Sequence, residues 1–513
     1  MYRRYERMLA HTITELQSLG LKVAEDSPNR KVGAGPAEGG ALLIEGIPAH
    51  VPFSSNFVSR SPYALRQLNG ESWLVKDGKF LLPAAIVRRP KFYEFLTDDK
   101  LPYSKIALLH GKNCIASTVL QTCAYWNSEK RCRFCGIELS LSAVQTTRTK
   151  TPAQLAEVIS KAKELDSISH VVLTTGAIHP AGKEIDYLGK CAKAIKKVCD
   201  LPIHAQFLPP TNEEKLHELK TAGVDTVGIH IESFDFDALA RFAPAKAAIG
   251  LAGYEKAWNK AVDIYGPNQV SSFLIVGLGE HEETIIKGSE FLAAMGVYPF
   301  VVPFRPIPGS MMQDHGTPDH ETMKRLYEAV VRILSKNGLS TEKSLAGCVR
   351  CGACSALQAY ELEARNRLMC RLVRSSTELA AALQIRKEVF VEEQGLFETS
   401  DVDDNDSKST HIIVEREDEI IGTVRVFPEN SACNHWVGGR LAVRSDSRDN
   451  QAGALLVRAA MRYVKKLGCT RFTAHIQEQN VNFFSVLGWK AVGPVEMYHG
   501  KPHQLMEADL DTV

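Results

Sequence analysis

The chain has 513 residues, too many for one ordinary domain, and at roughly 150 residues per domain we expect about three or four. Hydrophobic residues make up 44% and charged residues 24%, a globular composition that excludes a disordered, fibrous or collagen-like chain. The 61 Lys and Arg against 60 Asp and Glu give a net charge of +1. The chain therefore has no global basic field for nucleic acid or an anionic membrane, although a local patch stays open.

The N-terminal stretch 1–17 lacks the apolar core of a signal peptide. The most apolar run, Phe273 to Leu278, is far shorter than the ~18 residues that span a bilayer. We therefore expect a cytoplasmic protein without a membrane partner, and its 12 cysteines are not expected to form structural disulfides. Six of the cysteines fall in two tight clusters, so their spacing is the informative feature.

Residues 1–104 are expected to form an accessory α+β segment of unknown purpose. Within it, two short apolar runs, Ser72–Val75 and Phe80–Leu82, flank Asp77-Gly78. This dipeptide suits a type I′ turn, so the sequence predicts a β-hairpin here.

Residues 105–340 alternate strand-like runs with amphipathic helical stretches. The predicted strands are Cys114–Leu120, His170–Thr175, Ile203–Leu208, Thr226–Ile231, Val270–Val276 and Val297–Val302. A helix is predicted over Pro152–Leu165, with Thr151 as its N-cap. The alternation indicates parallel β/α units. Six units are too few for a closed eight-stranded barrel, so we predict a partial (β/α)6 barrel with ligands at the carboxyl ends of its strands.

The first cysteine cluster, Cys123, Cys132 and Cys135, directly follows the first predicted strand of the barrel. Three thiolates can hold three irons of a [4Fe–4S] cluster and leave the fourth iron open to a ligand. A zinc site normally needs four ligands, and this loop has no fourth Cys or His. Three unrelated buried cysteines are the other alternative, and the position at a strand end disfavours it.

These residues resemble the radical-SAM superfamily, whose members carry a three-cysteine loop after the first strand of a partial barrel. An aromatic residue precedes the last cysteine in that family, and Phe134 occupies that place, which implies contact with the adenine. The family spacing is usually three and two residues, whereas here it is eight and two. The resemblance implies a [4Fe–4S] cluster and S-adenosylmethionine as cofactors.

The same resemblance implies further cofactor contacts. Thr174, Thr175 and Gly176 stand where the family often has a Gly-Gly-Glu turn facing the amino group of S-adenosylmethionine, but the carboxylate is missing. Glu232 lies in a Glu-Ser ending common on the fourth strand of related members, and it implies a further cofactor contact. Phe273–Glu280 is similar to the fifth strand and turn, where ribose and adenine rest.

Two predicted strands carry pairs of polar residues on one face. Alternation places His230 with Glu232, and His204 with Gln206. Such pairs are costly in a packed barrel unless a polar ligand occupies its centre, although a satisfied core network stays open for the second pair. His230 is predicted to be catalytic. Arg305 is a candidate partner for a substrate carboxylate or an ordinary surface arginine.

The resemblance also implies the chemistry. S-adenosylmethionine would chelate the open iron, and one electron from the reduced cluster would cleave a C–S bond. The resulting 5′-deoxyadenosyl radical would abstract hydrogen from a small-molecule substrate, while the protein excludes water and sets the geometry. The electron would come from a reductase or donor such as ferredoxin or flavodoxin.

The second cysteine cluster, Cys348, Cys351 and Cys354, lies in a Cys-rich extension over residues 341–370. Its two-residue gaps match the C-x2-C-x2-C run of bacterial ferredoxins, but the final Cys-Pro of that run is missing. Cys370 could complete the site, or the site could stay open for substrate. A second iron–sulfur cluster, zinc with a further ligand, and thiols that bind nothing all remain open.

Residues 371–513 are predicted to form a separate α/β domain, and they resemble the GCN5-related N-acetyltransferase (GNAT) family. In that family a turn at a helix N-terminus offers N–H groups to the pyrophosphate of coenzyme A. The resemblance implies acetyl-CoA contacts at Leu441, Val443, Arg448, Gly453, Ala454 and Asn480. Gln451 replaces the first glycine of the turn and Asp449 adds a negative charge, so weak or absent acyl-CoA binding stays open.

Further stretches resemble one subgroup of small-molecule acetyltransferases, namely 386–394, the acidic run 401–406, His411 and 500–506. Phe484 stands where many members have a tyrosine that protonates the leaving thiolate. Candidates for deprotonating the amine are Glu392, Glu393 and His503, each with a surface or structural role as the alternative.

The sequence thus predicts a bifunctional enzyme, with radical chemistry on a small nitrogenous metabolite and N-acetylation of an amine. Residues 1–370 resemble a radical-SAM family encoded beside a nitrilase and an acetyltransferase in bacterial nitrogen-metabolism clusters. An Elongator-like tRNA-modifying enzyme is an alternative, disfavoured by the near-zero net charge, the cysteine spacing and the lack of a basic N-terminal segment. A non-catalytic sensor or docking role for the C-terminal domain is the other.

Overall fold

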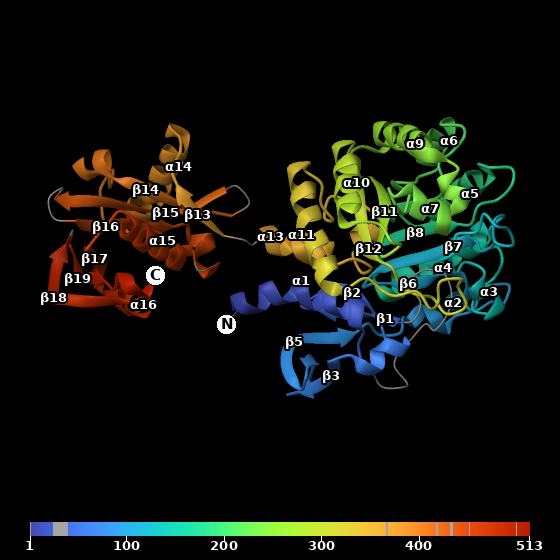
Figure 1. The fold of residues 1–513 in the computed structure, drawn as a ribbon, viewed down its shortest axis with the longest axis horizontal. Helices are drawn as coiled ribbons and strands as arrows, with labels where there is room; N and C mark the ends of the chain where they lie inside the picture. Colours follow the sequence, from blue (N-terminus) through green and yellow to red (C-terminus); the bar gives the residue numbers. More distant parts are fainter. Residues whose placement is uncertain are drawn as a thin grey trace. The chain divides into compact units, whose positions relative to one another are not determined.

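The computed structural model describes residues 2–513 except 24–38, 366–367, 417–418, 431–433, 451 and 499. The chain divides into two compact units, Met1–Glu363 and Ala364–Val513, and each is described by itself (Figure 1). Within the described ranges, no helix combines the length and apolar character that crossing a membrane requires.

The first unit begins with a helix and an antiparallel sheet. Helix α1 (Tyr2–Leu19) precedes five strands in the order β2-β1-β5-β4-β3. Their bounds are β1 Gly39–Ile44, β2 Ile47–Pro52, β3 Tyr63–Leu68, β4 Glu71–Lys76 and β5 Lys79–Ile86. Asp77 and Gly78, between β4 and β5, have φ angles of 49° and 78°. Two successive positive φ angles are what a type I′ turn requires, so the predicted hairpin is confirmed.

A curled sheet forms the centre of the first unit, in the order β12-β11-β10-β9-β8-β7-β6 (Figure 1). Its strands are β6 Leu108–His110, β7 Cys114–Leu120, β8 His170–Thr175, β9 Ile203–Gln206, β10 Thr226–Gly228, β11 Val270–Val276 and β12 Val297–Pro303. The six strands β7 to β12 pair in parallel, and β6 adds an antiparallel edge to β7. The open strand order confirms the predicted partial (β/α)6 barrel.

A helix follows each parallel strand. These helices are α4 Pro152–Asp166, α5 Lys183–Val198, α6 Glu214–Thr221, α9 Gly250–Tyr265, α10 Glu282–Ala294 and α11 His320–Lys336. Thr151 and Gln154 form a capping box at the start of α4, which satisfies two backbone donors and confirms the predicted helix start. Every residue of β12 is buried, as expected for a parallel strand covered by helices.

Two barrel strands end earlier than predicted. β9 stops at Gln206 rather than Leu208, and β10 stops at Gly228 rather than Ile231. The Phe273 N–H on the neighbouring strand donates to Nδ1 of His230 at 3.2 Å. A side-chain ring thus takes a hydrogen bond that a longer β10 would take with its backbone. Placing His230 and Glu232 on a strand was therefore wrong, because both follow its end.

The Cys-rich extension comprises α12 (Gly347–Cys351) and α13 (Leu357–Arg365). The buried carboxylate of Glu361 accepts hydrogen bonds from the Tyr298 hydroxyl at 2.6 Å and from the backbone N–H and hydroxyl of Thr341, both at 2.9 Å. Hydrogen bonds to a charged acceptor are the stronger kind, so Glu361 fixes the extension to β12.

The second unit is a twisted sheet in the order β13-β14-β15-β16-β17-β19-β18. Its strands are β13 Met369–Leu372, β14 Thr410–Arg416, β15 Glu419–Asn430, β16 His435–Val443, β17 Arg471–Gln477, β18 Trp489–Tyr498 and β19 Lys501–Ala508. Its main helices are α14 Ser376–Lys387, α15 Ala452–Lys466 and α16 Val481–Val486, and a π-helical turn η3 Glu388–Glu393 follows α14. β16 and β17 pair in parallel over only three residues each, so the remainder of the two strands lies unpaired with one another.

Candidate functional site

The loop that follows β7 brings Cys123, Cys132 and Cys135 together, as predicted. Their thiols are close enough for each charge to affect the others. Burial raises the pKa of Cys132 to about 12 and that of Cys135 to about 11, and a nearby cation, Lys246, opposes both shifts. The loop therefore places three thiols near two positive charges, those of Lys246 and Arg131.

Lys246 is the main residue that sequence reasoning missed. Lys246 Nζ donates to Oε1 of Glu232 at 2.5 Å and to the carbonyl oxygen of His230 at 2.7 Å. Burial acts to lower the pKa of Lys246, but Glu232 outweighs it and the pKa is raised, so the side chain stays charged. The only signal in the sequence is a single lysine within an alanine-rich stretch after the fourth strand.

Glu232 is held in an unusual conformation. Its φ of 77° is in the left-handed region that non-glycine residues rarely adopt, and it forms an isolated bridge with Leu274 of β11. One carboxylate oxygen pairs with Lys246, and the other, Oε2, is buried without a hydrogen-bond partner in the described structure. A buried acceptor without a partner is costly, so the arrangement suits a ligand that donates to Glu232.

The turn after β8 packs directly on the cysteine loop. A Cβ added to Gly176 would lie 2.0 Å from the carbonyl oxygen of Thr122, the residue before Cys123, so only glycine fits there. The Ala124 N–H also donates to the Ala177 carbonyl at 2.7 Å. Thr174 and Thr175 lie at the end of β8, where they precede this contact. The structure thus places the predicted cofactor turn against the start of the cysteine loop.

Phe134 lies against the turn that follows β11. It packs on a cluster that includes Leu278, Phe304 and Met312. The Glu280 carboxylate closes this turn by accepting from the N–H groups of Gly277 at 2.8 Å and Leu278 at 2.9 Å. The two segments predicted to hold the adenosine therefore share one hydrophobic cluster.

Two histidines share the interior of the barrel. A Cβ on Gly228 would lie 2.8 Å from Nε2 of His230 and 2.9 Å from Nε2 of His204, so the glycine makes room for both rings. Burial lowers the pKa of His204 to about 3 and also lowers that of His230, so both rings are neutral. Neither buried Nε2 atom has a partner among the described residues.

The hydrogen bonds of each ring assign the protons. Nδ1 of His230 accepts from the Phe273 N–H, so Nε2 of the neutral ring carries the proton and is a donor. His204 is anchored through Nδ1 to the Thr226 hydroxyl at 2.7 Å. The alternative of a fully satisfied core network does not hold for His204, because its Nε2 is left unpaired.

Arg305 is engaged within the fold. Its guanidinium contacts Nδ1 of His50 at 2.6 Å and donates to the His50 carbonyl at 2.6 Å. It therefore ties the loop after β12 to strand β2 of the N-terminal sheet, which neither a surface arginine nor a free substrate anchor would do.

The second cysteine set contacts two strands of the barrel, β9 and β7. Gln206 Nε2 donates to Sγ of Cys348 at 3.3 Å, and Cys351 packs against Cys114, the first residue of β7. A Cβ on Gly347 would lie 2.6 Å from the His204 ring, near the start of β9. The N-terminal accessory sheet reaches the same loop, because the His50 N–H donates to the Ala353 carbonyl at 2.6 Å.

In the part of the chain that the structure describes, no group of three or more His, Cys, Asp or Glu side chains is arranged to hold a single metal ion. Zinc would draw its four ligands to about 2.0–2.3 Å from one point. An iron–sulfur cluster places its cysteines around a larger inorganic core.

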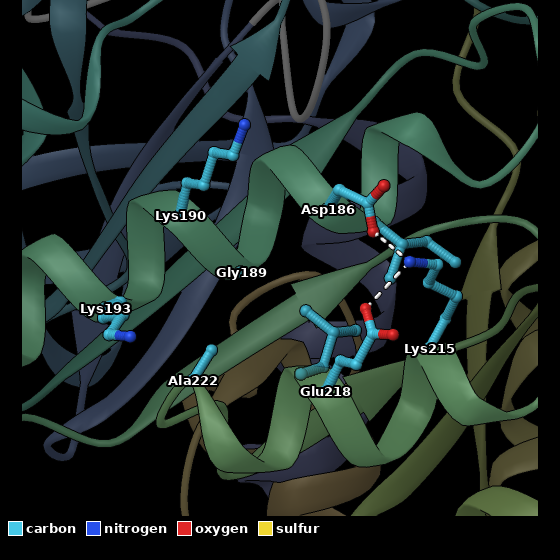
Figure 2. A pocket seen from close by; sticks show the side chains of 9 residues that line it. Asp186, Gly189, Lys190, Lys193, Lys215, Glu218 and Ala222 are labelled. Atoms are coloured by element: carbon cyan, nitrogen blue, oxygen red, sulfur yellow. Dashed lines mark hydrogen bonds and ion pairs between the residues drawn. The ribbon is translucent and has the colours of Figure 1, made fainter.

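A surface pocket on the outer helical layer is unrelated to these sites. It lies between α5 and α6, where Lys215 pairs with Asp186 at 2.7 Å and with Glu218 at 2.8 Å (Figure 2). None of the predicted site residues lines it.

In the second unit, several predicted acetyl-CoA contacts meet near the start of α15. Arg448 Nε donates to the Val443 carbonyl at 3.0 Å, and a Cβ on Gly453 would lie 3.6 Å from the Phe483 ring and 4.0 Å from Val443. The half-buried Leu441 and Ala454 flank this place, whereas Asn480 is exposed at the start of α16. Gln451 lies outside the described residues.

Arg448 also pairs through both terminal nitrogens with Glu393, at 2.6 and 2.5 Å. This pairing lowers the pKa of Glu393, which makes it a poor base for an amine. A bidentate pair at this position also means that a phosphate would have to compete with Glu393 for the guanidinium.

The other base candidates differ in burial. Glu392 has a 55% exposed side chain and one ion pair, with Lys387 at 3.7 Å. His503 is buried on β19 between Gln477 of β17 and Glu496 of β18, and its Nδ1 lies 2.9 Å from the Lys501 carbonyl. Phe484 is buried against Trp489, with ring centroids 5.4 Å apart.

The acidic run is part of a buried ionic network rather than a solvated face. The fully buried Arg386 pairs with Asp401 at 2.8 Å and with Asp406 at 2.5 Å, and Arg425 pairs with Asp403 at 2.6 Å. His411 lies 3.7 Å from Asp406. Removing one partner from such a network would leave a buried charge uncompensated, so these residues are structural.

Comparison with known proteins identifies two families within the chain. The Radical SAM superfamily model matches residues 129–292, and the Acetyltransferase (GNAT) family model matches residues 377–489. The protein named "Putative acetyltransferase BSU40680" of Bacillus subtilis (strain 168) is 31% identical over 148 residues, 27% of this chain and 95% of that protein.

Two further similarities cover one region each. A bacteriochlorophyllide c C-7(1)-hydroxylase of Chlorobaculum limnaeum is 23% identical over 234 residues, 42% of this chain and 58% of that protein. The crystal structure of Escherichia coli ElaA matches 28% of this chain and 100% of its own, with 24% identity and a TM-score of 0.26.

Proposed function

The chain belongs to the GNAT acetyltransferase family through residues 377–489 and carries a radical SAM domain in its first unit. From this premise we propose a bifunctional enzyme, with one activity in each unit. The first unit would carry out radical chemistry on a small nitrogenous metabolite through a [4Fe–4S] cluster and S-adenosylmethionine. The second would transfer an acetyl group from acetyl-CoA to an amine. The resemblance of residues 1–370 to a family encoded beside a nitrilase supports a place in nitrogen metabolism.

One observation carries the proposal. Three thiols share a loop at the carboxyl end of β7, and a buried Lys246–Glu232 pair lies beside them. Cys123, Cys132 and Cys135 would hold three irons of the cluster. When bound, such a cluster would supply the one-electron chemistry for the reductive cleavage of S-adenosylmethionine.

The residues around the loop would bind and orient. Lys246, charged and fixed by Glu232, would attract a carboxylate, and the unpaired Oε2 of Glu232 would accept from an amine N–H. Thr174, Thr175 and Gly176 would contribute hydroxyl and backbone oxygens, and Phe134 would pack against the adenine. An α-amino acid group of S-adenosylmethionine has both groups that these side chains complement.

Deeper in the barrel, His230 would orient the substrate. Its Nε2–H is a buried donor without a partner among the described residues, and its ring is held by Phe273 through both a hydrogen bond and stacking at 4.2 Å. A neutral imidazole donor would bind a carbonyl or hydroxyl oxygen of the substrate without adding charge. The apolar walls around it would keep water from the radical.

In the second unit, the gap between β16 and β17 would admit the pantetheine arm of acetyl-CoA. The unpaired ends of these strands offer backbone groups near Leu441 and Val443, and the start of α15 at Gly453 and Ala454 would face the pyrophosphate. His503, buried on β19 with its ring against Tyr498, would accept a proton from the amine, while Glu392 is exposed.

Anaerobic reconstitution with iron and sulfide, followed by an assay of 5′-deoxyadenosine with dithionite, tests the first half. We expect wild type to form 5′-deoxyadenosine and Cys132→Ala to form none, while Cys191→Ala, a buried cysteine of α5 away from the loop, stays active. Cleavage that survives Cys132→Ala would rule out the proposed cluster. Ferredoxin or flavodoxin in place of dithionite tests the proposed donor.

A second candidate for the C-terminal unit is a sensor or docking role, and the Arg448–Glu393 pair favours it. Calorimetry of the full chain with acetyl-CoA separates the two. Binding with turnover of an amine supports the transferase, binding without turnover supports a sensor, and no binding supports docking. Glu393→Gln is expected to strengthen binding, since it frees Arg448 for phosphate.

A further inference from the structure

A fourth thiol, that of Cys114, joins the three of the Cys-rich extension. Cys114, the first residue of β7, is buried and packs against Cys351 together with Ala116 and Val172. Cys114 is also close enough to Cys348 and Cys354 for their charges to affect it. Cys114 is 234 positions before Cys348, so only the fold brings it to the set.

The backbone of the loop is held from several elements. The Ala353 carbonyl accepts from the His50 N–H at 2.6 Å and from Gln17 Nε2 at 3.1 Å, and the Ser355 hydroxyl donates to the Val301 carbonyl at 2.6 Å. These contacts come from β2, α1 and β12. Hydrogen bonds to three separate elements therefore fix the backbone that carries these cysteines.

Glycines allow the loop to sit this deep. Gly347 has a φ of 96°, and a Cβ there would lie 2.6 Å from the His204 ring. A Cβ on Gly111, in the turn before β7, would lie 2.7 Å from Sγ of Cys351. Both glycines bring backbone close to the thiol set, as a site built around a bulky group requires.

The set differs from ordinary buried cysteine. Cys191, equally buried, lies in the apolar core, and burial raises the pKa of its thiol to about 12. Cys348 instead accepts a hydrogen bond from Gln206 Nε2 at 3.3 Å. Amide donors to cysteine sulfur are a usual feature around iron–sulfur clusters, where they help set the potential.

The other candidate for a fourth ligand is Cys370, which belongs to the second unit. Cys370 is in β13 of the second unit, paired with Val414 of β14. The thiol that the fold places against Cys351 is Cys114.

We propose that Cys114, Cys348, Cys351 and Cys354 are the four ligands of a second [4Fe–4S] cluster. This inference rests on the proposed function only in taking the chain to be an iron–sulfur protein. Four thiolates occupy all four irons, so the cluster would have no open iron and would not bind substrate through the metal.

The test removes the first site and counts the iron that remains. A variant with Cys123, Cys132 and Cys135 all changed to Ala, reconstituted anaerobically, is expected to hold about four iron and four sulfide per chain, against about eight for wild type. Adding Cys114→Ala should reduce the iron to three or fewer per chain, and a three-iron product would show an EPR signal in the oxidised state. Adding Cys114→Ser, which is nearly isosteric, checks that the loss does not come from misfolding.

Cys191→Ala and Cys370→Ala, each added to the same triple variant, are the controls, and both should keep about four iron. The inference is overturned if the triple variant holds zinc or no iron, if Cys114→Ala keeps the iron as Cys191→Ala does, or if Cys370→Ala loses it instead. The 5′-deoxyadenosine assay is read separately. A triple variant that keeps its iron beside a wild type that makes no 5′-deoxyadenosine would retain this inference and reject the proposed function.

Discussion

The two cysteine sets of the first unit have different surroundings. The set after β7 has three thiols, a buried cation, Lys246, and a carboxylate oxygen of Glu232 without a partner in the described structure. The set at the strand starts has a fourth thiol, Cys114, and an amide, Gln206, directed at sulfur. A buried cation lies near each set, Lys246 near the first and Arg305 near Cys354 of the second. The number of neighbouring thiols, rather than nearby charge or cysteine spacing, is therefore the difference between the proposed open site and the proposed closed one.

The largest expected effect comes from removing the charge beside the open site. Lys246→Met would leave Glu232 buried without its cation, which costs roughly 3–5 kcal/mol of unfolding free energy for a broken buried pair. We expect 5′-deoxyadenosine formation to fall at least about 100-fold, since roughly 1.4 kcal/mol lost in binding or orientation is tenfold. Urea unfolding and the cleavage assay measure the two effects.

The control is the double variant Lys246→Met with Glu232→Gln, which removes both charges. It should recover much of the stability but none of the cleavage. Recovery of cleavage in the double variant would mean that the pair is structural and that the open site needs no fixed charge.

Gly176→Val is expected to empty the open site while sparing the closed one. Its Cβ would collide with the Thr122 carbonyl at 2.0 Å and push the cysteine loop away. Iron content should fall from about eight to about four per chain, with cleavage lost. Gly189→Ala on α5, where the nearest atom would be an ordinary 3.6 Å away, is the matched control. Loss of all iron in Gly176→Val would show that the two sites are not independent.

Gly347→Ala addresses the closed site. Its φ of 96° and the 2.6 Å approach to the His204 ring make any side chain strained there, at a cost of about 1–3 kcal/mol in unfolding free energy. We expect the triple cysteine-to-alanine variant to lose its remaining iron when Gly347→Ala is added. Gly338→Ala has a φ of 66° but its nearest contact is 3.9 Å away, so it separates backbone strain from the collision.

The smallest effect is expected from Gln206→Leu. It removes the amide donor from Cys348 Sγ and should change the unfolding free energy by only about 1 kcal/mol, as for one neutral hydrogen bond. The reduction potential of the closed cluster should become more negative, because a hydrogen bond to sulfur stabilises the reduced state. A redox titration of the triple variant measures this. An unchanged potential would mean that Gln206 does not face a cluster.

Local patterns were sufficient for much of the fold. The Asp77-Gly78 turn, the capped start of α4 and the six strand–helix units could be predicted, because each depends on neighbours within a few residues. Strand ends could not, since the end of β10 depends on the ring of His230 taking the Phe273 N–H from the adjacent strand. The role of the predicted residues in acetyl-CoA binding by the second unit stays a prediction.

By itself, the sequence determined that a three-cysteine loop follows the first barrel strand and that a second run of three cysteines follows the last helix. Tertiary structure alone decided that Lys246 lies against Glu232, that Gly176 packs on the cysteine loop, and that Cys114 faces Cys351. The physical reason is distance along the chain. A motif within one loop is set by local spacing, whereas a partner from another strand is brought near only when parallel pairing and core packing stack the whole barrel.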